Sequence, residues 1–436
     1  MNSLIQNFED KKMPVLAKRN FMIFQVLANS VADSKAILVS LLGILGCTQS
    51  VFGEIPEGYL GTRPAGMGGA FTAVANDESS FFTNPAGISR IRKARSRKGV
   101  HLTLFPNGTV GFNSGASNLY TTLKSATGTD VAEAIAAANI VSDKPFYVRG
   151  ASFPAILFEG GKNFPVGVGF VGNSISKIYI DKDLPTDARI VSVTDAGGAI
   201  GFAFTNFENR LNLGISIRPT YRYAYEDTVP TSELKESTAL AKRMKQSSNS
   251  GFGLGIDAGL MFTLADFWFP TLGLAIRNLP TGCQTDYLNP FTEERQSVCG
   301  TVYSSKDGNP DALSNVDPMD LRVGFSISPR IAREFGVRFA ADLHNLYLTS
   351  GTTYYGLPGI DSGKLIHGGI EFFSGNPLEQ SGFSARIGAS QGFVSYGASF
   401  HAPFFHLEFA SYGVDVSDKA TKVEDRRYLG TAGFAF

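Results

Sequence analysis

The sequence predicts an all-β protein, a transmembrane antiparallel β-barrel of about 14 strands with an N-terminal hatch inside its lumen. Apolar and polar residues alternate with period two in one segment after another, as in strands with one apolar and one polar face. No segment approaches the roughly 18 apolar residues that a membrane helix needs. The last segment, YLGTAGFAF (428–436), keeps one apolar face up to an aromatic end, a feature that the outer-membrane assembly machinery recognises.

Composition favours a sheet of low charge. The 436 residues include 39 basic and 39 acidic side chains, so the chain lacks the basic excess that a nucleic-acid partner normally requires. Charged residues make up 18%, below the usual quarter, while Gly reaches 48 and Phe 35. This balance suits strands with an apolar outer face and a polar inner face.

The first 53 residues are predicted to be a signal peptide. The apolar run AILVSLLGILGC (36–47) would span about 18 Å as a helix, too short for a bilayer but long enough for a signal-peptide core. Cleavage after Ser50 or Gly53 fits this interpretation. The alternative is a lipobox that ends at Cys47 and leads to lipidation of that residue. Either leader indicates export, and together with the predicted barrel it indicates the outer membrane of a Gram-negative-type bacterium.

Alternation is clear in FGLGIDAGLMF (252–262), where Phe252 and Leu254 share one face and Asp257 lies on the other. Fifteen segments are candidate strands: 99–105, 108–115, 146–157, 165–180, 189–206, 211–225, 251–263, 268–278, 319–328, 335–346, 365–374, 382–390, 392–401, 404–412 and 427–436. Because single-chain bacterial barrels use an even number of strands, we expect two candidates to merge and give fourteen.

Two segments, 121–139 and 232–246, carry helical patterns with one polar face, and we expect them to cap or flank the barrel. A water-soluble β-sandwich would show the same alternation in its strands. The apolar face at the C-terminal end and the leader favour the membrane barrel over the sandwich.

Glycines crowd the stretch PAGMGGAFTAVANDESSFFTNPAG (64–87). A dinucleotide-binding loop is excluded, because Phe71 stands where the third glycine of that motif is required and no buried strand precedes the loop. Glycine also permits close backbone approach and positive φ, both useful in a plug that is pressed against a barrel wall. We therefore expect a hatch here, with a turn at Asn84-Pro85 that leads into the first strand.

Cys283 and Cys299 lie in the polar stretch LPTGCQTDYLNPFTEERQSVCGTVY (279–303). A disulfide is favoured because exported proteins fold in oxidising compartments. A metal site would need further ligands, and none is nearby in the sequence.

The stretch TRPAGMGGAFTAVANDESSFFTNPAGISRI (62–91) resembles the N-terminal region of FadL-type outer-membrane transport proteins and their PorV-type relatives. The segments 250–279 and 386–413 are similar to central and C-terminal hairpins of that superfamily, and the sequence leans towards the PorV-like branch. The resemblance implies a hatch at 54–97 and a fourteen-stranded barrel at 98–436. The expected hatch residues are Gly66, Gly68, Gly69, Asn84, Pro85 and Gly87.

The resemblance implies one of two functions. The first is passive transport of a hydrophobic small molecule, with Phe71, Phe81 and Phe82 of the hatch as possible ligand contacts; the alternative for each ring is simple packing of the plug. The second is a PorV-like barrel that docks a partner for protein secretion or surface attachment. Outer-membrane lipid is a partner in both cases.

The strand alternation places ten charged side chains inside the barrel: Arg218, Arg222, Asp257, Arg277, Arg322, Arg338, Asp342, Glu371, Arg386 and Glu408. Their mixed signs predict a salt-bridged interior that fixes the hatch. The chain has five histidines, and their spacing with Asp and Ser does not match a hydrolase, so we expect no enzyme and no cofactor.

Overall fold

The computed structural model describes residues 54–55, 58–95, 100–126, 131–138, 144–159, 163–180, 185–289, 291–305, 316–332, 335–374, 382–402, 405–417 and 422–435. The predicted leader (1–53), with Cys47, and the terminal Phe436 lie outside these ranges. Among the described residues, none of the helices is both long and apolar enough to cross a membrane.

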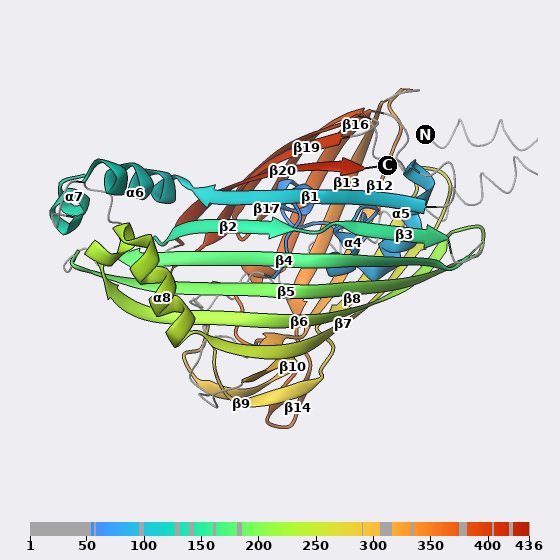
Figure 1. The fold of residues 1–436 in the computed structure, drawn as a ribbon. Helices are drawn as coiled ribbons and strands as arrows, with labels where there is room; N and C mark the ends of the chain where they lie inside the picture. The colour runs from blue at the N-terminus through green and yellow to red at the C-terminus, as the bar shows by residue number, and fades with distance from the viewer. Residues whose placement is uncertain are drawn as a thin grey trace, which may run out of the picture. The chain divides into compact units, whose positions relative to one another are not determined.

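The described strands close into a barrel (Figure 1). In order around the wall they are β1 (Val100–Asn113), β2 (Phe146–Ser152) with β3 (Ala155–Glu159), β4 (Pro165–Ile180), β5 (Asp187–Asn206), β6 (Leu211–Pro230), β7 (Asn249–Thr263), β8 (Thr271–Arg277), β12 (Asp320–Ile327), β13 (Phe335–Leu346), β16 (Ile366–Ser374), β17 (Gly382–Ser390), β18 (Phe393–His401), β19 (Phe405–Asp415) and β20 (Glu424–Ala435). Neighbours are antiparallel, and β20 returns to β1 with Ala432 opposite Gly108. With β2 and β3 counted as one interrupted strand, fourteen described strands form the ring.

The predicted number of strands is confirmed because the first two candidates, 99–105 and 108–115, merge into β1. β1 bulges at Asn107, whose φ is 27°, and the strand beside it breaks between β2 and β3. Asn107 Nδ2 donates to the Phe153 carbonyl at 2.7 Å, which replaces a missing ladder bond. Pro154 has no N–H to offer the ladder, so the interruption is expected at this position.

The outer face of the wall is apolar, and its inner face is polar. Val323, Phe325 and Leu407 are 41%, 42% and 51% exposed, while the inward-facing Ser326 is 3% exposed. This arrangement confirms the predicted alternation and is that of a barrel whose exterior contacts lipid.

The two ends of the barrel differ. One end carries tight connections such as 207–210 and 264–270, with the exposed aromatic residues Phe207, Phe267 and Trp268. The other end carries the long connections, whose folded insertions lie to the left and at the bottom of Figure 1. In bacterial barrels the short turns are periplasmic and the long loops extracellular.

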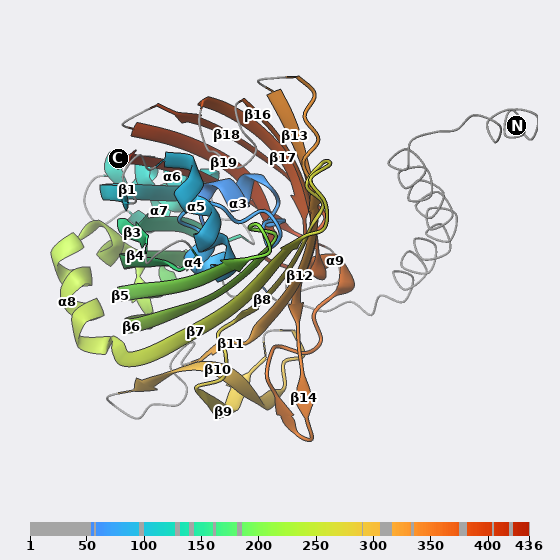
Figure 2. The ribbon, with the colours of Figure 1, turned by 90° about the vertical axis from the view of Figure 1, so that its right-hand side faces the viewer.

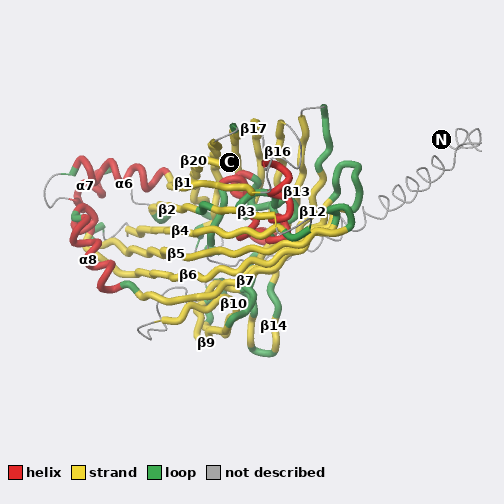
Figure 3. Tube along the Cα trace, turned by 45° about the vertical axis from the view of Figure 1, so that its right-hand side comes forward, coloured by secondary structure: helices red, strands yellow, loops and turns green. Residues whose placement is uncertain are grey.

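Helices cap the long-loop end, as Figure 3 shows. They are α6 (Ser114–Ser125), α7 (Val131–Ala137), the 3₁₀ helix η3 (Thr231–Lys235) and α8 (Ser237–Ser247). Leu119, Val131 and Ile135 share a buried apolar cluster with Phe146 of β2 and Val229 of β6. Both predicted helical segments are therefore confirmed. The first begins earlier than expected, because the Asn113 side chain caps it by accepting from Ala116 N at 2.9 Å.

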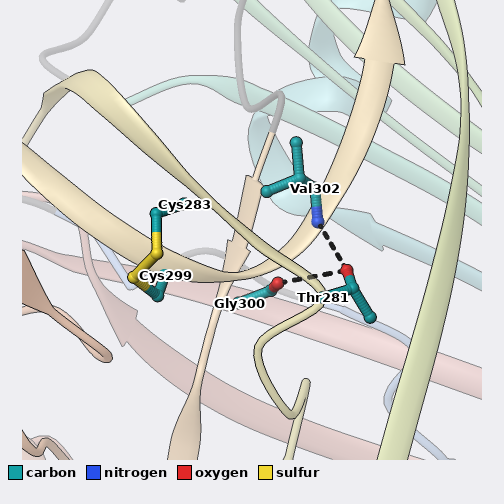
Figure 4. Close-up of a disulfide and its surroundings, with 5 residues drawn as sticks. All are labelled: Thr281, Cys283, Cys299, Gly300 and Val302. Carbon is teal, nitrogen blue, oxygen red and sulfur yellow. Dashed lines mark hydrogen bonds between the residues drawn. A yellow bond between two sulfur atoms is a disulfide. The ribbon is translucent and has the colours of Figure 1, made fainter.

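An insertion at the same end forms a small second sheet. Its elements are β9 (Gly282–Leu288), β10 (Arg295–Ser305), β11 (Val316–Pro318), β14 (Thr349–Ser350), β15 (Thr353–Tyr354) and the short helix α9 (Ser362–Leu365). Cys283 of β9 and Cys299 of β10 form a disulfide (Figure 4), so the predicted bond is confirmed. The expectation of a loop is wrong, because the two cysteines lie opposite each other in a β-hairpin, closed further by Thr281 against Gly300 and Val302.

Four short helices lie among the strands in the lumen (Figure 2). They are α3 (Thr62–Gly66), α4 (Ser80–Thr83), η2 (Pro85–Gly87) and α5 (Ile88–Arg95). The turn at Asn84-Pro85 does not lead into the first strand, as the sequence suggested. It starts η2 instead, because Asn84 Oδ1 accepts from Ala86 N at 3.1 Å and proline suits the first position of a helix.

Candidate functional site

Cross-strand glycine pairs on the inner wall receive the hatch: three of the pairs face its backbone, and Gly167–Gly201 faces the side chains of Phe81 and Ile88. Four pairs of directly opposed glycines lie on neighbouring strands: Gly167–Gly201, Gly214–Gly259, Gly273–Gly324 and Gly369–Gly388. A Cβ built on Gly273 would lie 2.6 Å from the Thr72 carbonyl, and one on Gly369 would lie 2.5 Å from the Met67 carbonyl. Any side chain at these wall positions would displace the hatch.

The hatch glycines face the wall from the other side. Gly66 lies against Gly397, with 3.0 Å between its built Cβ and the Gly397 Cα. Gly68 and Gly69 have φ of 63° and 84°, in the region that favours glycine. Gly87 differs, since its Cβ would meet the Ala75 carbonyl at 2.5 Å, within the hatch itself.

Asn84 holds the middle of the hatch together. Its Nδ2 donates to the Thr72 carbonyl at 2.7 Å and to the Leu260 carbonyl of β7 at 3.3 Å. The same side chain therefore caps η2, ties two hatch segments to each other and fixes both to the wall.

Glu371 of β16 is the strongest link between wall and hatch. Arg63 of α3 contacts it through two parallel hydrogen bonds, Nε to Oε1 and Nη2 to Oε2, each 2.8 Å long. Arg386 Nε contacts Oε1 at 2.8 Å, and Arg338 contacts Oε2. All four side chains are buried, and Arg63 also reaches Asp77 of the hatch at 3.0 Å. Arg63 was missed by the sequence analysis, although a cation inside a plug needs an acidic partner on the wall.

Asp342 of β13 holds the next hatch segment. Its Oδ2 accepts from Phe71 N and Thr72 N, both at 2.7 Å, and from His344 Nε2 at 3.2 Å. Ser326 of β12 donates to the Ala73 carbonyl at 3.1 Å. Wall side chains thus satisfy the backbone polar groups of an irregular segment that would otherwise be buried without partners.

The structure places the other predicted lumen charges as inward-facing ion pairs. Arg218 pairs with Asp257, Arg222 with Asp195 and Asp317, and Arg277 and Arg322 with Asp320. Glu408 also faces inward, with its Oε1 3.3 Å from His401 Nε2. Asp195, Asp317 and Asp320 were missed, and Asp317 belongs to β11 of the insertion, whose position over the lumen no strand pattern reveals. Burial would raise the pKa of Asp317, but the Arg222 guanidinium holds it below its ordinary value.

A cavity of about 200 Å³ lies between the hatch and the insertion. Its apolar lining includes Tyr59, Leu60, Phe82, Val171 and Leu357. Its polar lining includes Arg218, Arg277, Arg322, His344 and His367. The cavity therefore offers apolar surface beside a band of polar side chains from β6, β8, β12, β13 and β16.

Of the three hatch phenylalanines considered as ligand contacts, Phe82 lines this cavity. Phe81 packs edge-on against Phe153 with 5.2 Å between ring centroids, and Phe71 lies under the Arg63 guanidinium at 5.0 Å. Phe71 and Phe81 therefore pack within the plug, which was the alternative to a ligand contact. Among the described residues, no group of three or more His, Cys, Asp and Glu side chains is arranged to hold a metal ion.

No protein-family model and no curated protein sequence matches the chain. Among solved structures it is similar to the Pseudomonas putida toluene transporter TodX, with 12% identity and a TM-score of 0.46 over 89% of this chain and 99% of that one. The Ralstonia pickettii toluene transporter TbuX is 12% identical, with a TM-score of 0.45 over 86% of this chain and 97% of that one. A Pseudomonas aeruginosa FadL homologue is 11% identical, with a TM-score of 0.32 over 88% of this chain and 98% of that one. Similarity at this level supports no conclusion about function, and the barrel is established by its own strand pairing.

Proposed function

We propose that this barrel passively transports hydrophobic small molecules across the outer membrane, through a lumen that the hatch gates. The observation that carries the proposal is the cavity, which lies against the hatch and includes apolar side chains of the hatch and the wall in its lining. A barrel filled only for stability would have no reason to keep such a space, since protein interiors are otherwise close-packed.

The size of the cavity sets the size of the cargo. An apolar cavity of about 150 Å³ is known to hold a benzene molecule. At about 200 Å³, this cavity suits a molecule with one aromatic ring or a short alkyl chain. Larger molecules would need the N-terminal segment at Tyr59 and Leu60 to move.

A way out of the cavity lies beside the interruption of the wall. Phe82 lines the cavity and packs against Phe153 with 4.8 Å between ring centroids. Phe153 stands at the break between β2 and β3. Its carbonyl accepts from the Asn107 side chain instead of from a backbone N–H, while Phe153 N and the Pro154 carbonyl keep backbone bonds to Asn107 and Phe170. The hatch is bonded to the wall by buried ion pairs, so a sideways exit past Phe153 disturbs fewer contacts than expulsion of the whole hatch.

The test is uptake of a labelled monoaromatic compound by Gram-negative cells with and without the protein. The transporter should raise the initial uptake rate, and Val171→Trp, which fills the cavity from β4, should abolish the gain. Tyr120→Trp on the exposed face of α6 is the matched control. Equal uptake with and without the protein would contradict transport, and full uptake by a folded Val171→Trp barrel would place the route elsewhere.

A docking barrel of the PorV-like kind is the second candidate, and the long-loop end favours it. The helical cap packs on the ends of the strands through a shared apolar cluster, and the disulfide-linked insertion stands at the same end. Two ordered structures outside the wall provide a surface that a transporter of small molecules does not need. Cross-linking on intact cells tests this candidate: a large protein captured from the cap, and lost when α6 and α7 are replaced by a short turn, would support docking.

A further inference from the structure

A second cavity, of about 120 Å³, lies on the other side of the hatch, at the short-turn end of the barrel. Its lining runs from Ala73 and Arg90 of the hatch, along the inner face of the wall, to turn residues such as Asn209 and Asp266. None of its described lining residues borders the cavity between hatch and insertion. A single water needs about 10–15 Å³ of such space, so this mouth cavity has room for a small ligand.

The packing of α5 directs Arg90 to the mouth cavity. Ile88 and Ile91 are buried in an apolar cluster with residues of β3, β4 and β5. Residues three positions apart share one face of a helix, so Arg90 lies on another face. Its Nη2 donates to Thr263 Oγ1 at the end of β7, at 2.9 Å, and the side chain stays partly exposed. In Figure 1, α5 lies at the end of the barrel opposite the helical cap.

Arg90 has no acidic partner among the described residues, unlike the other two arginines of the lining. Arg210 pairs with Asp266 at 2.7 Å, and Arg338 pairs with Glu371. Burial and the neighbouring charge of Arg338 lower the pKa of Arg90 to about 10, and no acidic side chain offsets them. A guanidinium remains protonated at neutral pH even so, and Arg90 therefore brings an uncompensated positive charge to the cavity.

The rest of the lining adds a donor and little negative charge. Asn76 is 4% exposed; its Oδ1 accepts from Arg63 at 2.5 Å, while its Nδ2 has no acceptor among the described residues. Buried donors in proteins are nearly always paired, so this amide indicates an acceptor inside the cavity. Glu208 at the rim is exposed and does not compensate Arg90. The sequence of α5, ISRIRKAR, contains four basic residues and no acidic one.

A carboxylate or phosphate group supplies the negative charge and the acceptors that this lining lacks, because its oxygens accept charge-assisted hydrogen bonds from a guanidinium. We propose that the mouth cavity binds a small anion with a carboxylate or phosphate group, held by the guanidinium of Arg90. Arg90 belongs to the hatch and its neighbour Thr263 to the wall, so the bound anion joins hatch and wall at the periplasmic mouth. This site is separate from the transport proposed above and does not depend on the cargo.

The experiment measures hydrogen exchange of residues 86–91 in the full-length barrel, in phosphatidylcholine nanodiscs at constant ionic strength. Inorganic phosphate, acetate or acetamide is added; acetamide has nearly the shape of acetate but carries no charge. Phosphate and acetate should slow the exchange in a saturable way, by about tenfold at ten times the dissociation constant, and acetamide should not. Exchange that neither anion slows, or that acetamide slows as much as acetate, would overturn the proposal.

Substitutions at Arg90 test its role, each compared with its own exchange rate without anion. Arg90→Gln should abolish the response to phosphate and acetate. Arg90→Lys should weaken the response, because it keeps the charge but loses the planar set of donors. Arg189→Gln, which removes an arginine at the opposite end of the barrel, should respond like the wild type. A folded Arg90→Gln barrel that phosphate still protects would contradict the assignment.

Nanodiscs with phosphatidylglycerol identify the source of the anion. If a lipid headgroup fills the mouth cavity, residues 86–91 should exchange slowly before phosphate is added, and Arg90→Gln should remove this protection. If the ligand is a free anion, the exchange and its response to phosphate should be the same in both lipids. Slow exchange in phosphatidylglycerol that Arg90→Gln leaves intact would count against the site. Uptake of a hydrophobic cargo does not enter these measurements, so they can fail while the transport proposal stands.

Discussion

Arg63 in the hatch and Glu371 in the wall form a buried two-point ion pair, with both nitrogen–oxygen distances at 2.8 Å. Planar guanidinium and carboxylate groups match in this geometry, which makes such pairs directional as well as strong. Arg338 and Arg386 bind the same carboxylate. One acidic side chain therefore fixes the first hatch helix and two wall strands in a single arrangement.

Arg63→Ala should release the hatch while the barrel stays closed. Removing one partner of a buried pair typically costs about 3–5 kcal/mol because the other charge is left uncompensated. Glu371 keeps Arg338 and Arg386, so we expect a loss of hatch docking free energy of about 3 kcal/mol, at the lower end of that range. The barrel stays closed because its wall strands bond to one another. Planar-bilayer conductance should rise from a nearly closed wild type to a leaking variant. The exposed pair Arg189–Glu226 provides the control, since Arg189→Ala should cost about 0–1 kcal/mol and leave conductance unchanged. An Arg63→Ala barrel with the conductance of the wild type would show that the Arg63–Glu371 pair does not hold the hatch.

Gly388→Ala should also loosen the hatch, and it changes the wall alone. Its Cβ would enter the space of the Gly68 amide nitrogen, which is backbone and cannot turn aside. Gly150→Ala on β2 is the matched control, because its Cβ would meet nothing within 4 Å. We expect ion leakage from the first variant, as from Gly68→Val and Gly69→Val in the hatch, and none from the second. Leakage from both would mean that glycine matters for strand folding rather than for hatch seating.

The sequence predicted the architecture well because alternation in a barrel is dictated by lipid on one side and water or polar side chains on the other. It placed Asp257 and Glu371 inside for this reason alone. It could not reveal that Gly214 and Gly259 lie opposite each other, since strand register depends on the whole closed sheet. Nor could it place Asp317 or Tyr59 at the cavity, because both lie outside the repeating pattern.

Arginine at Val323 should destabilise the barrel by about 2–4 kcal/mol, since this side chain is exposed on the lipid face of β12. The control for Val323→Arg is Ser176→Arg on β4. Ser176 lies at the long-loop end of β4 beside Ser192, its Oγ 2.9 Å from the Ser192 Oγ, where polar side chains replace the apolar belt. Ser176→Arg should change the free energy of unfolding by about zero, because the cost of a charged side chain on the lipid face decreases towards the membrane interface. Ser326→Arg on the inner face of β12 is not a suitable control, because Ser326 donates to the Ala73 carbonyl of the hatch and the substitution would disturb the plug. Equal urea midpoints for Val323→Arg and wild type would mean that the apolar belt is misplaced.

Cys283→Ser should weaken the insertion without opening the barrel. The disulfide joins residues with a sequence separation of 16. For a loop of this length the loop-entropy model gives a stabilisation of the folded insertion by about 3 kcal/mol. Alkylation of intact protein without reductant should label neither thiol, and hydrogen exchange should quicken in β9 and β10 after reduction. Quicker exchange in β7 or β8 as well would show that the insertion supports the wall.

Glu54 ties the start of the described chain to the wall at the long-loop end, with Lys177 Nζ at 2.7 Å and Arg427 Nη2 at 3.0 Å. Burial would raise the pKa of Glu54, but the two cations outweigh it and lower the pKa from 4.5 to about 2. A lowered pKa in the docked state means that docking is favoured above pH 4.5 and that this contribution fades as the pH falls towards 2. Hydrogen exchange of residues 58–60, corrected for the intrinsic effect of pH, should therefore quicken across that interval. In Glu54→Gln the segment should exchange quickly at every pH, because the neutral amide leaves Lys177 and Arg427 without the carboxylate. Exchange that is slow in Glu54→Gln, or that does not change between pH 4.5 and 2 in the wild type, would contradict an electrostatic tether.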